Sequence, residues 1–339
     1  MLVDMHAHVI PENFPAAAGR AAAARWPSID HIGHGEAKVM IAGENFRTVH
    51  NGNWDIERRL TDMAATGVDV EVVSPMPELL SYWFTPEDGL EISRYLNEFI
   101  AGLCAAAPGR FYGLGAVPLQ DPDLASKELS RVKDAGLAGV ELGTNILGKS
   151  LGDERFRGFF QEASRLGLAV FVHALHPTFV DRIGGALANP IGFPTDTGLT
   201  ISSIIGSGAA EACPDLRIAF SHGGGTFPSM LPRLVHNWSG AWNEEPGSGG
   251  LGAGMLSRSP AEYARRFYYD TLVFDARAIR YLIDMIGPKQ LLVGSDYPYM
   301  EREQPVGKTL MSMHLPAATL EDITWHNTFR FLGTEPPAL

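Results

Sequence analysis

The sequence predicts an α/β protein with the architecture of a (β/α)8 TIM barrel and a small β-rich insertion after the first strand. Eight short apolar runs recur along the chain of 339 residues. Between them lie segments with apolar residues at three- and four-residue spacing, which is the pattern of amphipathic helices. Strands that alternate with helices form parallel sheets, and eight such units close a barrel. We therefore expect residues 1–339 to form a single domain.

The predicted strands and helices follow from these runs. The strands are residues 1–8, 68–75, 110–119, 138–144, 168–174, 216–224, 266–273 and 290–298. Helices are predicted at residues 53–67, 87–108 and 121–136, where Asp121 before Pro122 supplies a capping residue. The Ala- and Gly-rich stretch 200–212 is expected to be a packed helix. The main alternative, an open doubly wound sheet, predicts a Gly-rich turn after the first strand, where this sequence has HVIPENFP.

Two segments are longer than the loops of an ordinary barrel. Residues 9–50 exceed the usual length of a connection between a strand and a helix. The stretch HIGHGEAKVMIAGENFRTVHNG within this region alternates weakly and carries turn glycines. We therefore expect a small β-rich insertion near the mouth of the barrel. Residues 239–258 are rich in Gly and Ser and are expected to form a mobile loop.

The composition argues against several classes of function. The formal net charge of −12 disfavours nucleic acids and anionic membranes as partners, because the overall field repels them. The sequence lacks the basic and apolar leader of a signal peptide and any apolar run of about 18 residues. The two cysteines, Cys104 and Cys213, do not form a disulfide framework, which favours a reducing cytoplasm.

Two histidines, His6 and His8, lie at the end of the first predicted strand in VDMHAHVIP. Residues i and i+2 of a strand point to the same face, so these imidazoles project together. The C-terminal ends of barrel strands form the catalytic face, where two imidazoles can bind one divalent metal ion. Taken alone, this pair is better explained as two polar residues in a loop after a strand.

Three other predicted strands also end in a polar residue with metal-binding chemistry. The fifth ends at His173 in FVHALHP, the sixth at His222 in FSHGGG, and the eighth at Asp296 in LVGSDYP. Unrelated core histidines are not expected to end several strands of one barrel. Histidine and carboxylate ligands suit Zn²⁺ best and also accept Mn²⁺ or Fe²⁺. The sequence therefore predicts a metal site at this face, with zinc as the first choice.

This arrangement of histidines and aspartate resembles the amidohydrolase superfamily. No lysine ends the fourth strand in AGVELGT, so the resemblance implies a mononuclear site rather than a binuclear one. The chain is more closely similar to the 2-amino-3-carboxymuconate-6-semialdehyde decarboxylase family. The segments that carry this similarity are spread over the chain: DMHAHVIP, GEAKVM, NFRTVHNGNWD, LSYWFTPED, VPLQDPDLASKEL, SHGGGTFP and GSDYPY.

The resemblance assigns roles to the polar residues at the strand ends. It implies that His6, His8, His173 and Asp296 hold the metal ion, with a water molecule at an open position. His222 would lie beside that water as the acid/base residue, for which an imidazole pKa is well suited. The alternative for His222 is that it serves as a fifth ligand. Two further histidines are expected to cap or pack locally, namely His176 and His236.

The resemblance also implies two arginines that bind the substrate. Arg47 in NFRTVH corresponds to the arginine that binds the substrate carboxylate. Arg233 in MLPRLVHNW corresponds to one that the neighbouring subunit of a dimer contributes. Arginine binds a carboxylate through two parallel hydrogen bonds, which supply both charge and orientation. The alternative for each is an ordinary surface arginine. If both roles hold, a homodimer is required to complete the site.

The activity implied by the resemblance is non-oxidative decarboxylation of a small anionic substrate. A proton is delivered to the carbon that bears the carboxylate, and loss of CO2 then restores conjugation. No organic cofactor is expected, because SHGGGTF lacks both the Walker lysine and the spacing of dinucleotide-binding glycines. Its glycines are expected instead to let the backbone approach the metal pocket closely.

The sequence departs from the family where the substrate pocket is expected. HALHPTFVDR replaces the usual Pro-Trp-Asp after the fifth strand, and GFPTDT matches a Pro-Ala-Glu-Thr segment only loosely. The substrate is therefore either a carboxylated muconate semialdehyde or a related acid such as a hydroxybenzoate. Two other hypotheses stay open at this point. One is a metal-dependent hydrolase or hydratase, and the other is a metal-stabilised binding protein without catalysis.

Overall fold

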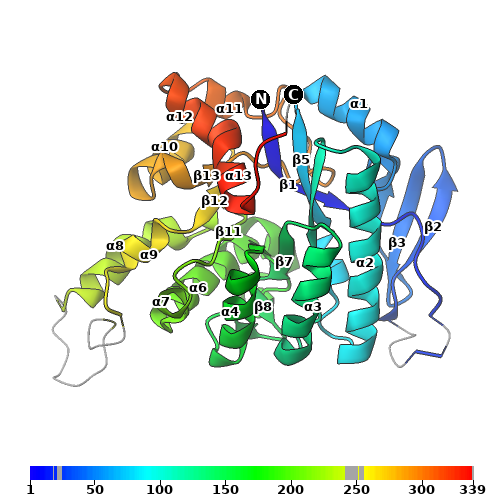
Figure 1. Cartoon of the computed structure of the whole chain (residues 1–339), viewed down its shortest axis with the longest axis horizontal. Coiled ribbons are helices and arrows are strands. Elements are labelled where there is room, and N and C mark those ends of the chain that lie inside the picture. Colours follow the sequence, from blue (N-terminus) through cyan, green and yellow to red (C-terminus); the bar gives the residue numbers. More distant parts are fainter. Residues whose placement is uncertain (18, 21–24, 241–250, 252–255, 338–339) are drawn as a thin grey trace.

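A computed structural model of the chain describes all residues except 18, 21–24, 241–250, 252–255 and 338–339. Eight parallel strands form one sheet in the order β1-β5-β6-β7-β10-β11-β12-β13 (Figure 1). Each strand is shorter in the structure than predicted; seven lie within the predicted segments, and β1 extends one residue beyond its segment, to Val9. Their bounds are Val3–Val9, Val70–Pro75, Phe111–Gly115, Gly139–Gly143, Ala169–His173, Ile218–Phe220, Tyr268–Asp270 and Leu291–Leu292.

The sheet closes into a nearly complete barrel because the first strand also bonds to the segment after the last one. The Met5 amide donates to the Val293 carbonyl at 2.8 Å, and the His8 amide donates to the Tyr297 carbonyl at 2.7 Å. A parallel bridge joins Ala7 to Tyr297 between these bonds. The predicted (β/α)8 architecture is therefore confirmed.

Helices cover the outside of the barrel. In Figure 1, α2 (Pro86–Ala106), α3 (Pro122–Asp134) and α4 (Arg157–Leu166) stand next to one another, and α2 packs on β6. The Asp121 side chain accepts a hydrogen bond from the Leu124 amide at the start of α3, as its position before Pro122 predicted. The remaining helices are α1 (Ile56–Thr66), α5 (Val180–Ile183), α6 (Phe193–Gly206), α7 (Ala209–Ala212), α8 (Phe227–Trp238), α9 (Pro260–Ala264), α10 (Ala276–Met285), α11 (Lys308–Met311), α12 (Ala317–Glu321) and α13 (Asn327–Leu332).

One predicted helix differs in the structure. Residues 200–212 do not form a continuous helix, because α6 ends at Gly206 and α7 begins at Ala209. Gly208 between them has a φ of 76°, a left-handed conformation that ends a helix and that glycine adopts at low cost. Within the described part of the chain, we find no helix with the length and apolar character needed to span a bilayer.

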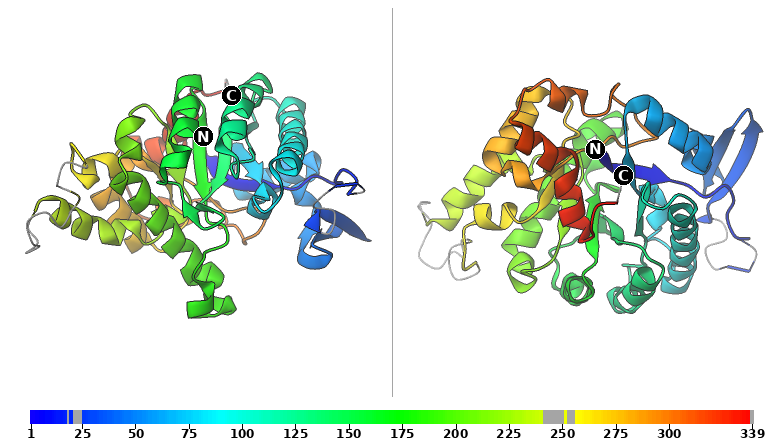
Figure 2. Two further views of the ribbon diagram at one scale, coloured as in Figure 1. Left: turned by 90° about the horizontal axis from the view of Figure 1, so that it is seen from below. Right: turned by 45° about the horizontal axis from the view of Figure 1, so that its top comes forward.

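The insertion after the first strand is a three-stranded antiparallel sheet. Its strands are β2 (Ser28–Gly33), β3 (Glu36–Ile41) and β4 (Glu44–His50), in that order. Figure 2 shows this sheet standing at one side of the barrel. The predicted β-rich insertion is confirmed. The predicted mobile loop at 239–258 falls largely outside the described residues.

Apolar side chains fill the end of the barrel at which the strands begin. Val3 and Val70, the first residues of their strands, pack in one buried cluster with Phe329 and Phe331 of α13. This helix therefore covers the N-terminal end of the barrel. The polar residues that end the strands lie at the opposite, C-terminal end of the barrel, which is where active sites occur in this architecture.

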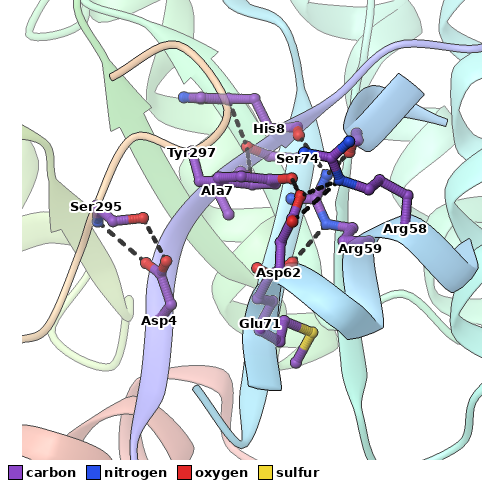
Figure 3. Close-up of polar contacts among 12 residues, drawn as sticks. Asp4, Ala7, His8, Arg58, Arg59, Asp62, Glu71, Ser74, Ser295 and Tyr297 are labelled. Atoms are coloured by element: carbon purple, nitrogen blue, oxygen red, sulfur yellow. Dashed lines mark hydrogen bonds and ion pairs between the residues drawn. The ribbon is translucent and has the colours of Figure 1, made fainter. Parts of the chain in front are cut away.

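A buried network of ion pairs and hydrogen bonds links strands β1 and β5 to the segment after β13; Figure 3 shows the part of it in which Asp4 contacts Ser295 and Arg59 contacts Glu71. The Glu71 carboxylate pairs with both Arg59 and Arg302, and Arg302 also contacts Asp4 at 3.3 Å. Burial raises the pKa of Glu71, but the two guanidinium charges outweigh this effect and hold the pKa below its ordinary value. Arg59 also donates to the His8 carbonyl at 2.9 Å, so the network fixes the backbone of β1 beside one of the predicted metal ligands.

Replacing Glu71 by alanine should destabilise the fold by about 3–5 kcal/mol, because two buried arginines would lose their counter-charge. Chemical denaturation followed by circular dichroism would measure this change in the free energy of unfolding. The matched control is Glu162, which pairs with Arg165 on the surface of α4. Its replacement by alanine should lower the free energy of unfolding by less than about 1 kcal/mol. Equal losses in the two variants would contradict a structural role for the network.

Candidate active site

The five polar residues predicted at the strand ends meet at the C-terminal end of the barrel. His6 and His8 lie on β1, and His173 is the last residue of β10. His222 begins a short turn directly after β11, and Asp296 follows β13. Because the strands are parallel, residues from distant parts of the sequence are brought to one point on the barrel axis.

Ligand atoms from these residues converge closely. One atom from each of four residues, His6, His173, His222 and Asp296, lies within 4.8 Å of the others. The His8 ring joins the same cluster, since its Nε2 is 3.1 Å from His6 Nε2 and 3.2 Å from Asp296 Oδ1. All four predicted metal ligands and the predicted acid/base residue therefore share one site.

The hydrogen bonds of three histidines orient their Nε2 atoms toward the centre of the cluster. His8 Nδ1 donates to the Pro75 carbonyl at 3.0 Å, and His173 Nδ1 donates to the Ala174 carbonyl at 2.9 Å. His6 Nδ1 donates to the Asp270 carboxylate at 2.7 Å. Since a carbonyl or carboxylate oxygen only accepts, each neutral ring presents an Nε2 lone pair. This is the arrangement in which metal-binding histidines are held by their second nitrogen.

The cluster fits a divalent cation. His173 Nε2 is buried and has no hydrogen-bond partner among the described residues. The His6 and His8 Nε2 lone pairs face each other at 3.1 Å, which is repulsive unless a cation lies between them. Bonds of about 2.0–2.1 Å at tetrahedral angles place two ligand nitrogens about 3.3 Å apart, close to the observed separation.

Burial and charge set the protonation states of the cluster. Burial lowers the pKa of His173 well below its ordinary value, and the neighbouring charges of His6 and His8 act in the same direction. Burial raises the pKa of Asp296, but the nearby His8 ring and the positive charges that His6, His8 and His173 would carry if protonated act in the other direction and lower the pKa overall. Neutral imidazole and ionised carboxylate are the forms that bind metal ions.

The glycines after His222 shape the turn that holds this residue. His222 and Asp296 adopt left-handed φ values of 55° and 57°. Gly225 has a φ of 59°, and a Cβ atom there would lie 1.9 Å from the Pro194 carbonyl oxygen. The glycine-rich stretch therefore lets the backbone pack closely beside the pocket, as the sequence predicted.

Asp270, the last residue of β12, is a site residue that the sequence analysis missed. It is fully buried and accepts hydrogen bonds from His6 Nδ1 and from the backbone amides of His222 and Gly223. Burial raises its pKa, but these bonds and the His6 charge lower it overall. The sequence concealed it, because Asp270 lies inside the predicted strand 266–273, whereas the strand in the structure ends at Asp270.

Replacing Asp270 by asparagine should weaken metal binding by about 10–100-fold, the usual cost of losing the partner that orients a histidine ligand. The amide keeps the size of the carboxylate but not its charge or its purely accepting character. Competition with a chromophoric chelator would measure the metal dissociation constant. Asp215→Asn, on the exposed surface, is the control. An unchanged dissociation constant in Asp270→Asn would exclude this orienting role.

The fourth strand contributes a carboxyl group rather than a lysine. Glu141 on β7 is fully buried, and its Oε2 lies 3.8 Å from His8 Nδ1. Burial raises its pKa well above the ordinary value. The position therefore supplies no carboxylated lysine, in agreement with the expectation from AGVELGT.

The two predicted substrate arginines lie in different surroundings. Arg47 on β4 places its guanidinium 4.3 Å above the centre of the Tyr299 ring, and that ring stacks on His8 with centres 5.6 Å apart. Arg47 is thus one side chain away from the cluster. Arg233 lies on α8 with an exposed side chain. It does not line either of the two pockets at this end of the barrel.

Two pockets flank the cluster. One of about 410 Å³ is bordered by His222 and Asp296 and by apolar side chains that include Phe193 and Pro194 of the GFPTDT segment. The other, of about 310 Å³, is lined by Leu175 and His176, among others. The two segments that depart from the family thus line pockets. His176 also packs its ring edge against Trp83, and His236 lies exposed on α8.

Comparisons with known proteins agree with this geometry. A family model described as amidohydrolase matches residues 3–334. A 2-amino-3-carboxymuconate-6-semialdehyde decarboxylase of Dictyostelium discoideum is 34% identical over 337 residues, which cover 98% of this chain and 92% of the relative.

Two solved structures are also similar. The 5-carboxyvanillate decarboxylase of Sphingomonas paucimobilis has a TM-score of 0.81 and 26% identity, with 98% of this chain and 99% of that chain covered. A dihydroxybenzoic acid decarboxylase of Polaromonas sp. JS666, with bound manganese and an inhibitor, has a TM-score of 0.72 and 23% identity, with 82% and 85% covered.

Proposed function

The chain belongs to the amidohydrolase family and is a carboxy-lyase, and we propose that it decarboxylates an acid of aromatic catabolism in a metal-dependent, non-oxidative reaction that releases CO2. The substrate is a carboxylated muconate semialdehyde or a related aromatic acid. The observation that carries this proposal is the convergence of three Nε2 lone pairs and the Asp296 carboxylate beside His222, at the end of a barrel similar to known decarboxylases.

His6, His8, His173 and Asp296 are the residues that would hold the cation. Such a cation acts as a Lewis acid and lowers the pKa of water in the site. Zinc suits three imidazoles and one carboxylate, and manganese is the second choice because the Polaromonas relative contains it. The chain's own contribution is to hold these groups in position through Asp270, Pro75 and Ala174.

His222 is placed to move a proton. Its ring borders the 410 Å³ pocket, and Asp270 anchors its backbone amide at 2.9 Å. Burial lowers its pKa, so the protonated ring gives up its proton more readily than an exposed imidazole does. In the proposed reaction the protonated His222 ring gives its proton to the carbon bearing the carboxylate, so an N–H bond breaks as the C–H bond forms, and solvent later reprotonates the ring. The C–C bond to the carboxylate then breaks, its electron pair restores conjugation, and CO2 leaves.

Arg47 and Arg233 would bind the anionic substrate. The Arg47 guanidinium lies over the Tyr299 ring, and a guanidinium held in this way can still donate N–H groups to a carboxylate. Arg233 lies exposed on α8, which supports its contribution to the site of a second subunit in a homodimer.

The free cysteines Cys104 and Cys213 support a reducing, cytoplasmic location.

Mixing two inactive variants would test the shared site. Arg47→Ala and Arg233→Ala should each lower kcat/KM, because each removes a charge that binds the substrate. After dissociation and random reassociation, about half of the dimers carry one intact site, so about a quarter of the wild-type activity should return. Mixing without dissociation is the control. No recovery in dimers shown to have exchanged subunits would mean that Arg233 acts within its own chain or not at all.

Isotope labelling separates decarboxylation from hydrolysis or hydration. When the enzyme converts an acid substrate in D2O, a decarboxylase places deuterium on the carbon that lost CO2. In water enriched in ¹⁸O, it adds no oxygen to the organic product. Incorporation of ¹⁸O without release of CO2 would instead identify a hydrolase or hydratase that uses the same site.

A further inference from the structure

The pocket of about 310 Å³ beside the metal cluster contains an unassigned carboxylate, Glu78. Glu78 lies in a short turn (Pro77–Leu80) that follows β5 at the C-terminal end of the barrel. The pocket wall is mainly aromatic and aliphatic, with Phe46, Trp83 and Leu175 among its lining residues. A pocket of this size and character accommodates a single substituted ring or an equivalent conjugated chain.

Glu78 lies at the same end of the barrel as the metal cluster, because its turn follows the C-terminal end of β5. Burial raises its pKa, and the charges that modify this effect belong to Arg47, His8 and Asp296. Arg47 comes from the insertion, His8 from β1, and Asp296 from the segment after β13. Glu78 thus lies in the wall of the pocket, at the end of the barrel that holds the cluster.

Arg25, His176 and Thr178 also line this pocket, and two further polar side chains there, Asn145 and Tyr82, are already hydrogen-bonded. The Asn145 amide donates to the Leu175 carbonyl at 2.9 Å and to the Asp196 carboxylate at 3.0 Å. The Tyr82 hydroxyl accepts from the Gly143 amide at 3.1 Å. Neither Glu78 nor Arg47 forms an ion pair with another side chain in the part of the chain that the structure describes. The carboxylate accepts a hydrogen bond from its own backbone amide, and its remaining lone pairs are available to an outside donor.

We propose that Glu78 determines specificity by accepting a hydrogen bond from a hydroxyl or amino substituent of the substrate. This inference rests on the proposed function and defines its substrate more narrowly. A partly buried carboxylate loses hydration that only a donor replaces, so an ether or methyl group in the same place leaves it unpaired. A substrate carboxylate is repelled there and is directed toward Arg47 instead.

Calorimetric titration of the zinc-loaded protein would test the proposal with matched pairs of probes. The probes are 2-, 3- and 4-hydroxybenzoate, each compared with its methyl ether. At one position or more, the hydroxy acid should bind at least about tenfold more tightly than the ether. Glu78→Leu should abolish this ratio, and Glu78→Gln, which keeps the shape but not the charge, should reduce it. Glu44→Gln, at an exposed position on β4, should leave it unchanged.

The outcomes separate this proposal from the proposed function. Equal binding within all three pairs, absence of binding, or a ratio that survives in Glu78→Leu would overturn the role of Glu78. Release of CO2 is measured on the same samples. If Glu78→Leu abolishes the ratio but neither these acids nor a carboxylated muconate semialdehyde loses CO2, the binding role stands and decarboxylation is contradicted. If CO2 is released and the ratio of the two affinities is the same in Glu78→Leu as in the wild type, only the specificity role is contradicted.

Discussion

Replacing Asp296 by alanine should remove the metal ion and reduce turnover below detection. Asp296 brings an ionised carboxylate to within 3.2 Å of His8 Nε2 and 3.6 Å of His6 Nε2. Its loss leaves a ring of neutral imidazoles with no anion to offset the charge of a divalent cation. We expect the metal affinity to fall by more than about 100-fold, beyond the cost of losing an orienting partner.

Metal content after dialysis, together with kcat, would measure this effect. Asp215→Ala removes an exposed carboxylate and should bind metal as the wild type does. Circular dichroism would establish that both variants are folded. An Asp296→Ala protein that keeps a full complement of metal would show that the aspartate is not a ligand.

Replacing His222 by asparagine should lower kcat by about 10²–10⁴-fold while the metal stays bound, because the substitution removes the group that moves the proton. The backbone should tolerate the change, since His222 has a φ of 55° and asparagine readily adopts the left-handed region. The control is His314→Asn at an exposed position with a φ of 50°, and this variant should remain fully active.

Two other results for His222→Asn are informative. Loss of the metal together with the activity would identify His222 as a fifth ligand, which is the alternative that its place in the cluster leaves open. Full turnover with the metal retained would exclude a role for His222 in proton transfer. The combined measurement of metal content and kcat therefore decides between the two roles.

Much of this architecture is readable in the sequence because the signals are local. Each barrel strand is a short apolar run, and the polar residues that end these runs meet because parallel strands end at the same face. His173, His222 and Asp296 are distant in sequence from His6, yet their positions at strand ends were sufficient to bring them together. The β-rich insertion was predicted from length and turn glycines in the same way.

Other features depend on contacts that no local pattern encodes. Arg302 and Glu71 pair across 231 positions of the sequence, and Asp270 and His6 across 264. In the sequence alone, Glu71 and Arg302 cannot be distinguished from ordinary polar residues of a strand and a loop. Glu78 was missed for a similar reason. Nothing in its local sequence shows that its turn lies close enough to Arg47 of the insertion for their charges to interact. The predicted helix at 200–212 was interrupted because Gly208 adopts a left-handed conformation.

Release of CO2 by metal-free and metal-restored protein tests the central claim most directly. The metal is removed with a chelator and returned as Zn²⁺ or Mn²⁺, and a panel of carboxylated muconate semialdehydes and hydroxybenzoates is supplied. We expect CO2 from at least one acid only when the metal is present, with about one metal ion per chain. Undiminished release by the metal-free protein, or none from any acid by a protein with its metal restored, would contradict a metal-dependent decarboxylase.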